Sequence, residues 1–166
     1  FRCLTVKTDG VTLRGLTFAN GWADYGGGVY ATGSGVAEVI DCTFTNCTAT
    51  GSGGGIDNAR EIRGCRFLGN HVGSYGGGAH YVGMICCSLF EGNVANTAGS
   101  ALNNCSKLLS CTFVSNSGDE TITGSDPQYS VFVDNPAVSG TGNLATNMDF
   151  FVAGTRRPTP AAAMEN

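Results

Sequence analysis

Charged residues and proline are scarce in this chain. Of its 166 residues only 13% are charged and 4 are proline, whereas 42% are hydrophobic and 26 are glycine. Disorder requires low hydrophobicity and high net charge, so this composition excludes it and fits one folded domain. The net charge of -4 gives no basic surface for nucleic acid. Many glycines with few prolines favour tight turns between short extended segments over helices.

Long apolar runs, a signal peptide and Cys-x-x-Cys pairs are also lacking. No apolar run reaches the roughly 18 residues that span a membrane, so no membrane span is expected. The chain begins at Phe1 inside a strand-like run, and we expect it to be a fragment of a longer protein or a mature product. None of the 8 cysteines forms a Cys-x-x-Cys pair, so we expect neither zinc nor any other metal or cofactor.

A repeat of 23 residues runs through most of the chain. It is clearest in an aromatic column made of Phe44, Phe67, Phe90 and Phe113. The glycine runs keep the same period, with Gly55 and Gly78 at the ends of successive runs. Apolar residues near each phenylalanine alternate with polar ones, which is the period of a strand. A unit this short cannot bury its own apolar face, so the units must stack.

The repeat predicts an all-β fold, a right-handed single-stranded parallel β-helix of about five or six coils. Three short strands and three turns would use one repeat, and neighbouring coils would lie about 4.8 Å apart. We expect residues 1–116 to form the β-helix repeats. Residues 117–166 would form an irregular last coil and a C-terminal capping tail of the same domain, since an open strand edge needs cover.

Two further columns predict structural ladders inside the coil. The first consists of small residues two positions before the phenylalanine, namely Cys42, Cys65, Ser88 and Cys111. We interpret its cysteines as buried apolar residues, and a Cys42–Cys65 disulfide is the alternative, because adjacent strands bring Cα atoms close enough. The second column lies three positions after the phenylalanine and consists of Asn70, Asn93 and Asn116. Near Phe18 and Phe44 the asparagine comes one position earlier, so this ladder is expected to run only from Asn70 to Asn116.

Two motifs carry a resemblance to a known family. Phe-x-x-Asn occurs at Phe67–Asn70, Phe90–Asn93, Phe113–Asn116 and Phe132–Asn135, and Gly-Gly-apolar occurs at 27–29, 54–56 and 77–79. The pairing resembles the repeats of polymorphic outer-membrane proteins, whose passenger domains are right-handed parallel β-helices that act as adhesins. Roughly residues 1 to 135 are also similar to the wider pectate-lyase-like superfamily. The resemblance implies a bacterial, secreted or cell-surface, autotransporter-like protein whose partner is a host or cell-surface glycan or protein.

The candidate ligand-binding residues follow the glycine runs. The second residue after each run should form one outward column, consisting of Tyr30, Asp57, His80 and Asn103. Asp57 and His80 would be neighbours and are the nearest approach to an acid–base pair in the sequence. Tyr30 would offer a stacking platform for a sugar, extended by Tyr25 and Tyr75 just before two of the runs. The alternative is an ordinary solvated polar face with the tyrosines folded over the turns.

Other candidates have simpler structural explanations. The glycine runs lack the Gly-Lys-Ser/Thr of a phosphate-binding loop and are interpreted as recurring corners. Glu38 and Glu61 would stack as paired carboxylates, whereas the cluster of Arg60, Arg63 and Arg66 near Glu61 is more simply interpreted as counter-charges. Two smaller sites are predicted as well: His71 as a turn residue, and Cys86-Cys87 as one buried and one turn residue.

The sequence therefore favours a non-catalytic, adhesin-like module that binds through a lateral face. The alternative is a carbohydrate-active enzyme fragment, similar to a polysaccharide lyase or glycoside hydrolase, or a glycan-binding module. A purely structural stalk is the third possibility. An enzyme should gather several carboxylates, or a carboxylate and a basic residue, in one lateral cleft.

Overall fold

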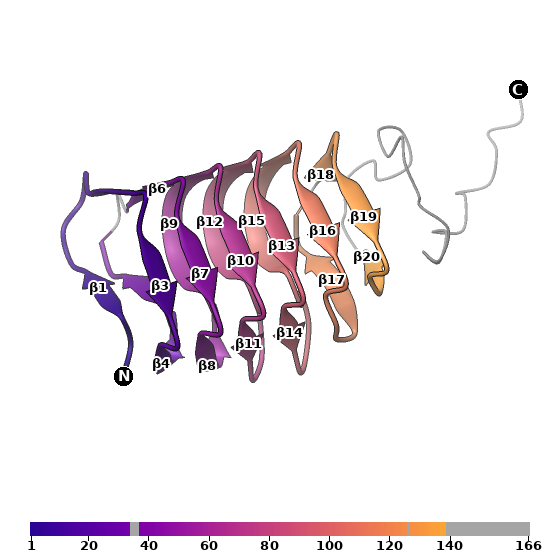
Figure 1. Cartoon of the computed structure of the whole chain (residues 1–166), viewed down its shortest axis with the longest axis horizontal. Helices are drawn as coiled ribbons and strands as arrows, with labels where there is room; N and C mark the ends of the chain where they lie inside the picture. Colours follow the sequence, from indigo (N-terminus) through magenta and orange to yellow (C-terminus); the bar gives the residue numbers. More distant parts are fainter. Residues whose placement is uncertain (34–36, 126, 139–166) are drawn as a thin grey trace, which may run out of the picture.

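The protein is a parallel β-helix. Its structure, a computed structural model, describes residues 1–33, 37–125 and 127–138. These residues form strands and turns without any helix, and therefore without a helix that could cross a membrane. About five coils of similar outline follow one another from the N-terminal end (Figure 1), which confirms the predicted fold class.

Three parallel sheets form the walls of the coil. The long sheet contains β1 (Leu4–Val6), β2 (Thr12–Arg14), β5 (Val29–Ala31), β6 (Glu38–Ile40), β9 (Ile56–Arg63), β12 (Ala79–Cys86), β15 (Leu102–Leu109), β17 (Glu120–Thr123), β18 (Pro127–Gln128) and β20 (Ala137–Val138). The phenylalanine sheet contains β3 (Thr17–Ala19), β7 (Thr43–Thr45), β10 (Arg66–Leu68), β13 (Leu89–Glu91), β16 (Thr112–Val114) and β19 (Val131–Val133). The short sheet contains β4 (Trp22–Tyr25), β8 (Thr48–Ser52), β11 (His71–Val72) and β14 (Val94–Ala95).

The strand register follows the sequence period. Phe67 lies opposite Phe44 on one side and Phe90 on the other, so residues 23 apart are neighbours in space. The last coil is shorter, because Phe113 pairs with Phe132, only 19 residues later. The predicted capping tail falls largely outside the described residues.

Stacked phenylalanine rings fill the centre of the coil. The rings of Phe44, Phe67 and Phe90 are fully buried, with centroids 4.7 and 4.6 Å apart and nearly parallel planes. The stack continues from Phe18 at one end to Phe132 at the other. Burial of each ring contributes about 2–3 kcal/mol, and stacking adds about 0.5–1.5 kcal/mol per pair. The predicted aromatic ladder is therefore the main apolar core.

The asparagine ladder is present and is longer than predicted. Asn93 Oδ1 accepts hydrogen bonds from the backbone N–H and the side-chain amide of Asn70, both at 3.0 Å. The same pattern continues through Asn116 to Asn135. Asn46 stands outside the ladder because it occupies a corner with φ of 52°, a left-handed conformation that asparagine tolerates. Cys47 takes the ladder position instead, and its N–H donates to Asn70 Oδ1 at 3.0 Å.

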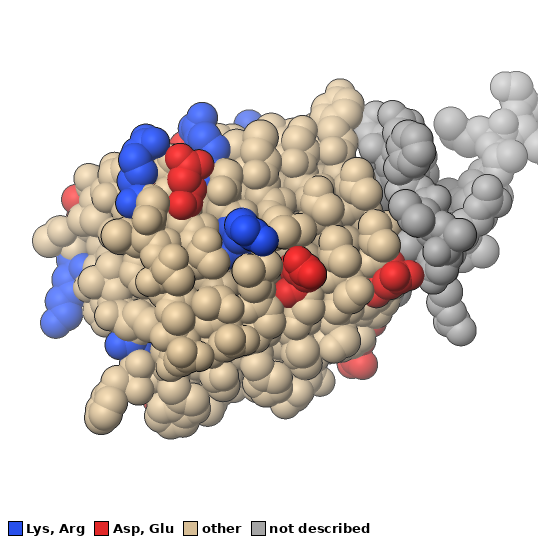
Figure 2. All heavy atoms as spheres, in the orientation of Figure 1, with Lys and Arg blue, Asp and Glu red and all other residues tan. Residues whose placement is uncertain are grey.

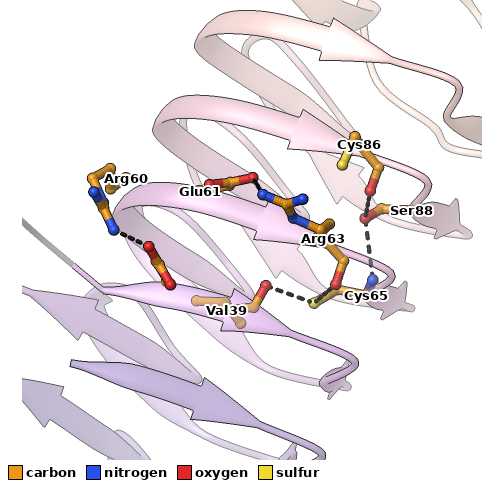
Figure 3. Close-up of polar contacts among 8 residues, drawn as sticks. Val39, Arg60, Glu61, Arg63, Cys65, Cys86 and Ser88 are labelled. Atoms are coloured by element: carbon orange, nitrogen blue, oxygen red, sulfur yellow. Dashed lines mark hydrogen bonds and ion pairs between the residues drawn. The ribbon is translucent and has the colours of Figure 1, made fainter. Parts of the chain in front are cut away.

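The cysteine column is a ladder of buried thiols. Cys42, Cys65 and Cys111 are each 1% exposed and free, so the structure contains no Cys42–Cys65 disulfide. Ser88 occupies the same column, and its hydroxyl accepts from the Cys65 N–H at 3.1 Å (Figure 3). Burial raises the pKa of Cys65 to about 12, which keeps this thiol protonated and inert near neutral pH.

The glycine runs are corners in which the coils pack most closely. Gly76 has φ of 71°, and a Cβ added there would lie 2.9 Å from the Cβ of His80. A Cβ on Gly77 would collide with the carbonyl oxygens of Ser100 and Val94, and one on Gly78 would lie 2.8 Å from the Phe90 ring. These runs therefore serve backbone geometry and close packing, as the sequence predicted.

The face that carries the phenylalanine sheet has few charges. Figure 2 shows that its charged side chains are scattered among neutral ones, with both signs present. No single-sign patch on this face marks a partner.

Candidate functional site

The predicted ligand column lies on the long sheet and crosses four coils. The register pairs Tyr30 of β5 with Asp57 of β9, Asp57 with His80 of β12, and His80 with Asn103 of β15. Because the strands are parallel and in register, these four residues form one continuous row. The structure therefore brings the predicted residues together in the predicted order.

Asp57 and His80 contact each other directly. The distance between His80 Nδ1 and Asp57 Oδ1 is 3.2 Å, and the Ser52 hydroxyl donates to the other carboxylate oxygen, Asp57 Oδ2. An ionised carboxylate can only accept, so Nδ1 of His80 carries the proton. This arrangement fixes the imidazole ring and leaves its Nε2 as the nitrogen for a further partner.

The expectation of a solvated outward column is wrong for two of its members. Asp57 and Asn103 are each only 6% exposed, whereas Tyr30 and His80 are half-buried. The cause is the glycine corner: a Cβ on Gly53 would lie 2.7 Å from the Asp57 Cβ, and one on Gly99 would lie 2.9 Å from the Asn103 Cβ. The side chains of Asp57 and Asn103 therefore pack against the glycine corners and are not exposed to solvent.

The tyrosines differ in how much of each ring is free. The Arg2 guanidinium lies 5.0 Å from the Tyr30 ring centroid, so a cation already occupies one face of that ring. Tyr25 is 51% exposed, and its ring centroid is 6.1 Å from that of Tyr30. Tyr75 is 44% exposed. Ser52 pairs with Tyr25 in the preceding coil and with Tyr75 in the following coil, so the two tyrosines lie in the same row of the stack. Tyr25 and Tyr75 are thus the freer aromatic surfaces beside the column.

A groove lies immediately beyond this column. The strands β9, β12 and β15 each bend at a left-handed residue, which is Asn58, Tyr81 or Asn104, with φ of 68°, 56° and 54°. The groove has a volume of about 500 Å³ and is lined by Asn58, Ala59, Arg60, Tyr81, Val82, Gly83, Asn104, Cys105, Ser106 and Gly124. Tyr81 is 62% exposed, and its ring centroid lies 5.8 Å from the His80 ring. The groove and the His80–Asp57 pair are therefore adjoining parts of one surface.

The residues that shape this groove escaped the sequence analysis. Asn58, Tyr81 and Asn104 also recur at the 23-residue period. The signal in the sequence was a break in the alternation of apolar and polar residues along the strand. The apolar residues Ile56 and Ala59, both buried, are separated by two residues instead of one. Such a break indicates a bulge or bend in the strand, and asparagine at two of the three positions favours the left-handed conformation.

The glutamate column is neutralised by arginines. Glu38 pairs with Arg60 and Glu61 pairs with Arg63 (Figure 3), so the interpretation as counter-charges is confirmed for these two arginines. Arg66, the third arginine of the predicted cluster, forms no ion pair within the described residues. None of the residues that line the groove is acidic. In the described part of the chain, no three His, Cys, Asp or Glu side chains gather as a group that could hold a metal ion.

Of two smaller predictions, one is wrong and the other is correct for only one of its two residues. His71 is not a turn residue but belongs to β11, where it pairs with Thr48 and Val94. Cys87 is the predicted turn residue, exposed at a corner with φ of 52°, but Cys86 is not buried: it is partly exposed at the end of β12. The 23-residue repeat does not show where each strand of the three sheets ends and a corner begins, and both differences arise at such a boundary.

Comparison with protein-family models, curated proteins and solved structures gives no match. The parallel β-solenoid is accordingly the level at which the fold is identified.

Proposed function

We propose that this protein is a non-catalytic binding module of a bacterial secreted or cell-surface protein, adhesin-like, which holds a glycan on the lateral face formed by β9, β12 and β15. The observation that carries the proposal is the groove of about 500 Å³ bounded by Asn58, Tyr81 and Asn104. Its size falls in the range of ligand-binding clefts.

The lining chemistry suits a neutral sugar. Asn58 and Asn104 are partly or fully exposed, and amides both donate to and accept from hydroxyl groups. Tyr81 presents an exposed ring on which the apolar face of a pyranose could pack, with its hydroxyl free for a polar contact. The floor contains the buried Ala59 and Val82. An apolar floor with a few polar groups at the rim is the usual composition of such sites.

The resemblance to adhesin passenger domains and to the pectate-lyase-like superfamily supports the same proposal. The resemblance implies a parallel β-helix that acts as an adhesin. The fold does not by itself assign a function, so the groove is the feature on which the proposed function rests.

A carbohydrate-active enzyme is the second candidate, and the contact between His80 and Asp57 favours it. A histidine oriented by a carboxylate is a common general base. A glycosidase, however, uses a second carboxylate across the scissile bond, and no acidic side chain lines the groove. We therefore place binding ahead of catalysis.

The test is a glycan array followed by calorimetry on the best ligand, with wild type, Tyr81→Ala and Tyr129→Ala. Tyr129 is the matched control, because it is 64% exposed with φ of 51° at a different corner, against 62% and 56° for Tyr81. Loss of a stacking contact worth about 1.4 kcal/mol should weaken binding about tenfold in Tyr81→Ala. Tyr129→Ala should bind like wild type.

Three outcomes would count against the binding module. Absence of any glycan ligand, or equal affinity of the two tyrosine variants, removes the groove as a glycan site. Release of sugar products by wild type, abolished in His80→Ala, would replace the binding module with the enzyme.

A further inference from the structure

Two cysteines from different coils converge near the N-terminal end. Cys3 directly precedes β1, and its neighbour in the next coil is Gly28, whose carbonyl accepts a hydrogen bond from the Leu4 N–H at 3.0 Å. Cys47 directly precedes β8, and its neighbour in the previous coil is Gly21, whose carbonyl accepts from the Thr48 N–H at 2.8 Å.

Each cysteine points toward the glycine that neighbours the other. A Cβ added to Gly21 would lie 2.9 Å from Cys3 Sγ, and a Cβ added to Gly28 would lie 3.2 Å from Cys47 Sγ. A Cβ on Gly21 would also meet the Gly27 carbonyl oxygen, and one on Gly28 would also meet the Gly55 carbonyl oxygen, so both sulfur atoms lie against closely packed glycine backbone. Later coils have a different arrangement, in which the ladder position of Cys47 holds Asn70 or Asn93.

The sulfur atoms also share the same stretch of backbone. Cys3 Sγ lies 3.5 Å from the carbonyl oxygen of Ala19, and Cys47 Sγ lies 3.5 Å from that of Phe18. Burial, with a smaller contribution from the neighbouring Cys3 thiol, raises the pKa of Cys47 to about 11. An effect of Cys3 on Cys47 agrees with the contacts above, which place the two sulfur atoms near each other.

We infer that Cys3 and Cys47 are a disulfide-forming pair that fastens the first coil to the second. Cys3 precedes β1 of the first described coil and Cys47 precedes β8 of the next, so a covalent link between them joins two successive coils. Cross-linking closes a loop across coils and restricts the unfolded chain. The inference is independent of the glycan proposal, because neither cysteine lines the groove.

The oxidant is a small disulfide such as oxidised glutathione. The exposed Cys3 loses its proton and attacks one sulfur of the oxidant, which forms a mixed disulfide and releases one thiolate. Cys47 then loses its proton and attacks the Cys3 sulfur, releasing the second thiolate. The two protons end on the two released thiols, so two cysteine thiols are oxidised and one disulfide is reduced. Because the pKa of Cys47 is about 11, the second step should accelerate as pH rises from 7 to 9.

The experiment treats the folded, reduced protein with oxidised glutathione near pH 8.5, alkylates the remaining thiols and maps peptides without reduction. The expected result is a cross-linked peptide pair containing Cys3 and Cys47, with a mass lower by two hydrogen atoms than the sum of the two thiol peptides. Cys3→Ser should lose the cross-link, and its midpoint of urea unfolding after oxidation should be lower than that of oxidised wild type.

Cys87→Ser is the matched control, because Cys87 is also exposed and free; it should keep the cross-link. Cys3→Ser is preferred to Cys47→Ser because Cys47 is buried and its replacement risks misfolding. Recovery of Cys3 as an alkylated thiol or only as its glutathione adduct would overturn the inference. Pairing of either cysteine with another residue, such as Cys42, would do the same.

Discussion

Replacement of Asn93 by alanine tests whether the asparagine ladder holds the coils together. The Asn93 side chain is fully buried and takes part in four hydrogen bonds. Its oxygen accepts two from Asn70, at 3.0 Å each, and its amide donates to the Phe67 carbonyl and to Asn116 Oδ1, at 2.9 Å each. In alanine all four are lost, and no water takes their place unless the interior opens.

The magnitude follows from these four contacts. A buried hydrogen bond contributes about 1 kcal/mol net, and a buried group left without a partner costs about 1–3 kcal/mol. We therefore expect Asn93→Ala to lower the free energy of unfolding by about 4 kcal/mol. Domains of this size are stable by about 5–15 kcal/mol, so the effect should be large in urea unfolding followed by circular dichroism.

Asn96→Ala is the matched control, because Asn96 is exposed in the same coil. It should change stability by less than about 0.5 kcal/mol. Asn135→Ala covers the case in which Asn93→Ala does not fold, since Asn135 ends the ladder, is only partly buried and should cost less. A loss for Asn93→Ala no larger than that for Asn96→Ala would refute the ladder as a stabilising element.

Two further predictions concern packing and pH. Gly77→Ala should cost several kcal/mol or prevent folding, because the added methyl group meets two carbonyl oxygens; Gly92→Ala, with open space around it, should cost only about 1–2 kcal/mol for its left-handed conformation. A thermal melt that ranks Gly92→Ala as the more damaging change would contradict the close-packing argument. Burial raises the pKa of Cys65 and Cys111 from 9.0 to about 12, so the unfolded chain loses these protons first. Stability should therefore be full below pH 9 and fall as pH rises toward 12, by up to about 1.4 kcal/mol per pH unit for each thiol. Cys65→Ser, which copies the native Ser88 of the same column, should make urea midpoints fall less steeply above pH 9, and an unchanged slope would contradict the assignment.

The core could be predicted from the sequence because its residues recur in every coil. In a parallel stack, the 23-residue spacing of Phe44, Phe67 and Phe90 becomes strand register directly, so each column becomes a ladder. The ladders that contain Cys42 and Asn70 could be predicted in the same way, from the 23-residue period. The extension of the ladder to Asn135 was missed because the last coil is shorter than the others.

The candidate site was predictable only in part. The order of Tyr30, Asp57, His80 and Asn103 came from the period, whereas their burial came from contacts with corner glycines that no spacing reveals. The groove depends on bends inside β9, β12 and β15, which the alternation pattern did not resolve.

The sequence alone thus determined a stacked parallel coil and the residues that fill it, because repetition fixes which residues become neighbours in adjacent coils. The tertiary structure decided everything that depends on where each coil bends. Residues in the left-handed conformation form the groove beside Tyr81 and keep Asn46 out of the asparagine ladder. The glycine corners likewise bring Asp57 into contact with Ser52 and His80. Cys3 and Cys47 are 44 residues apart in the sequence, and each comes near the glycine beside the other only once the chain has wound into successive coils.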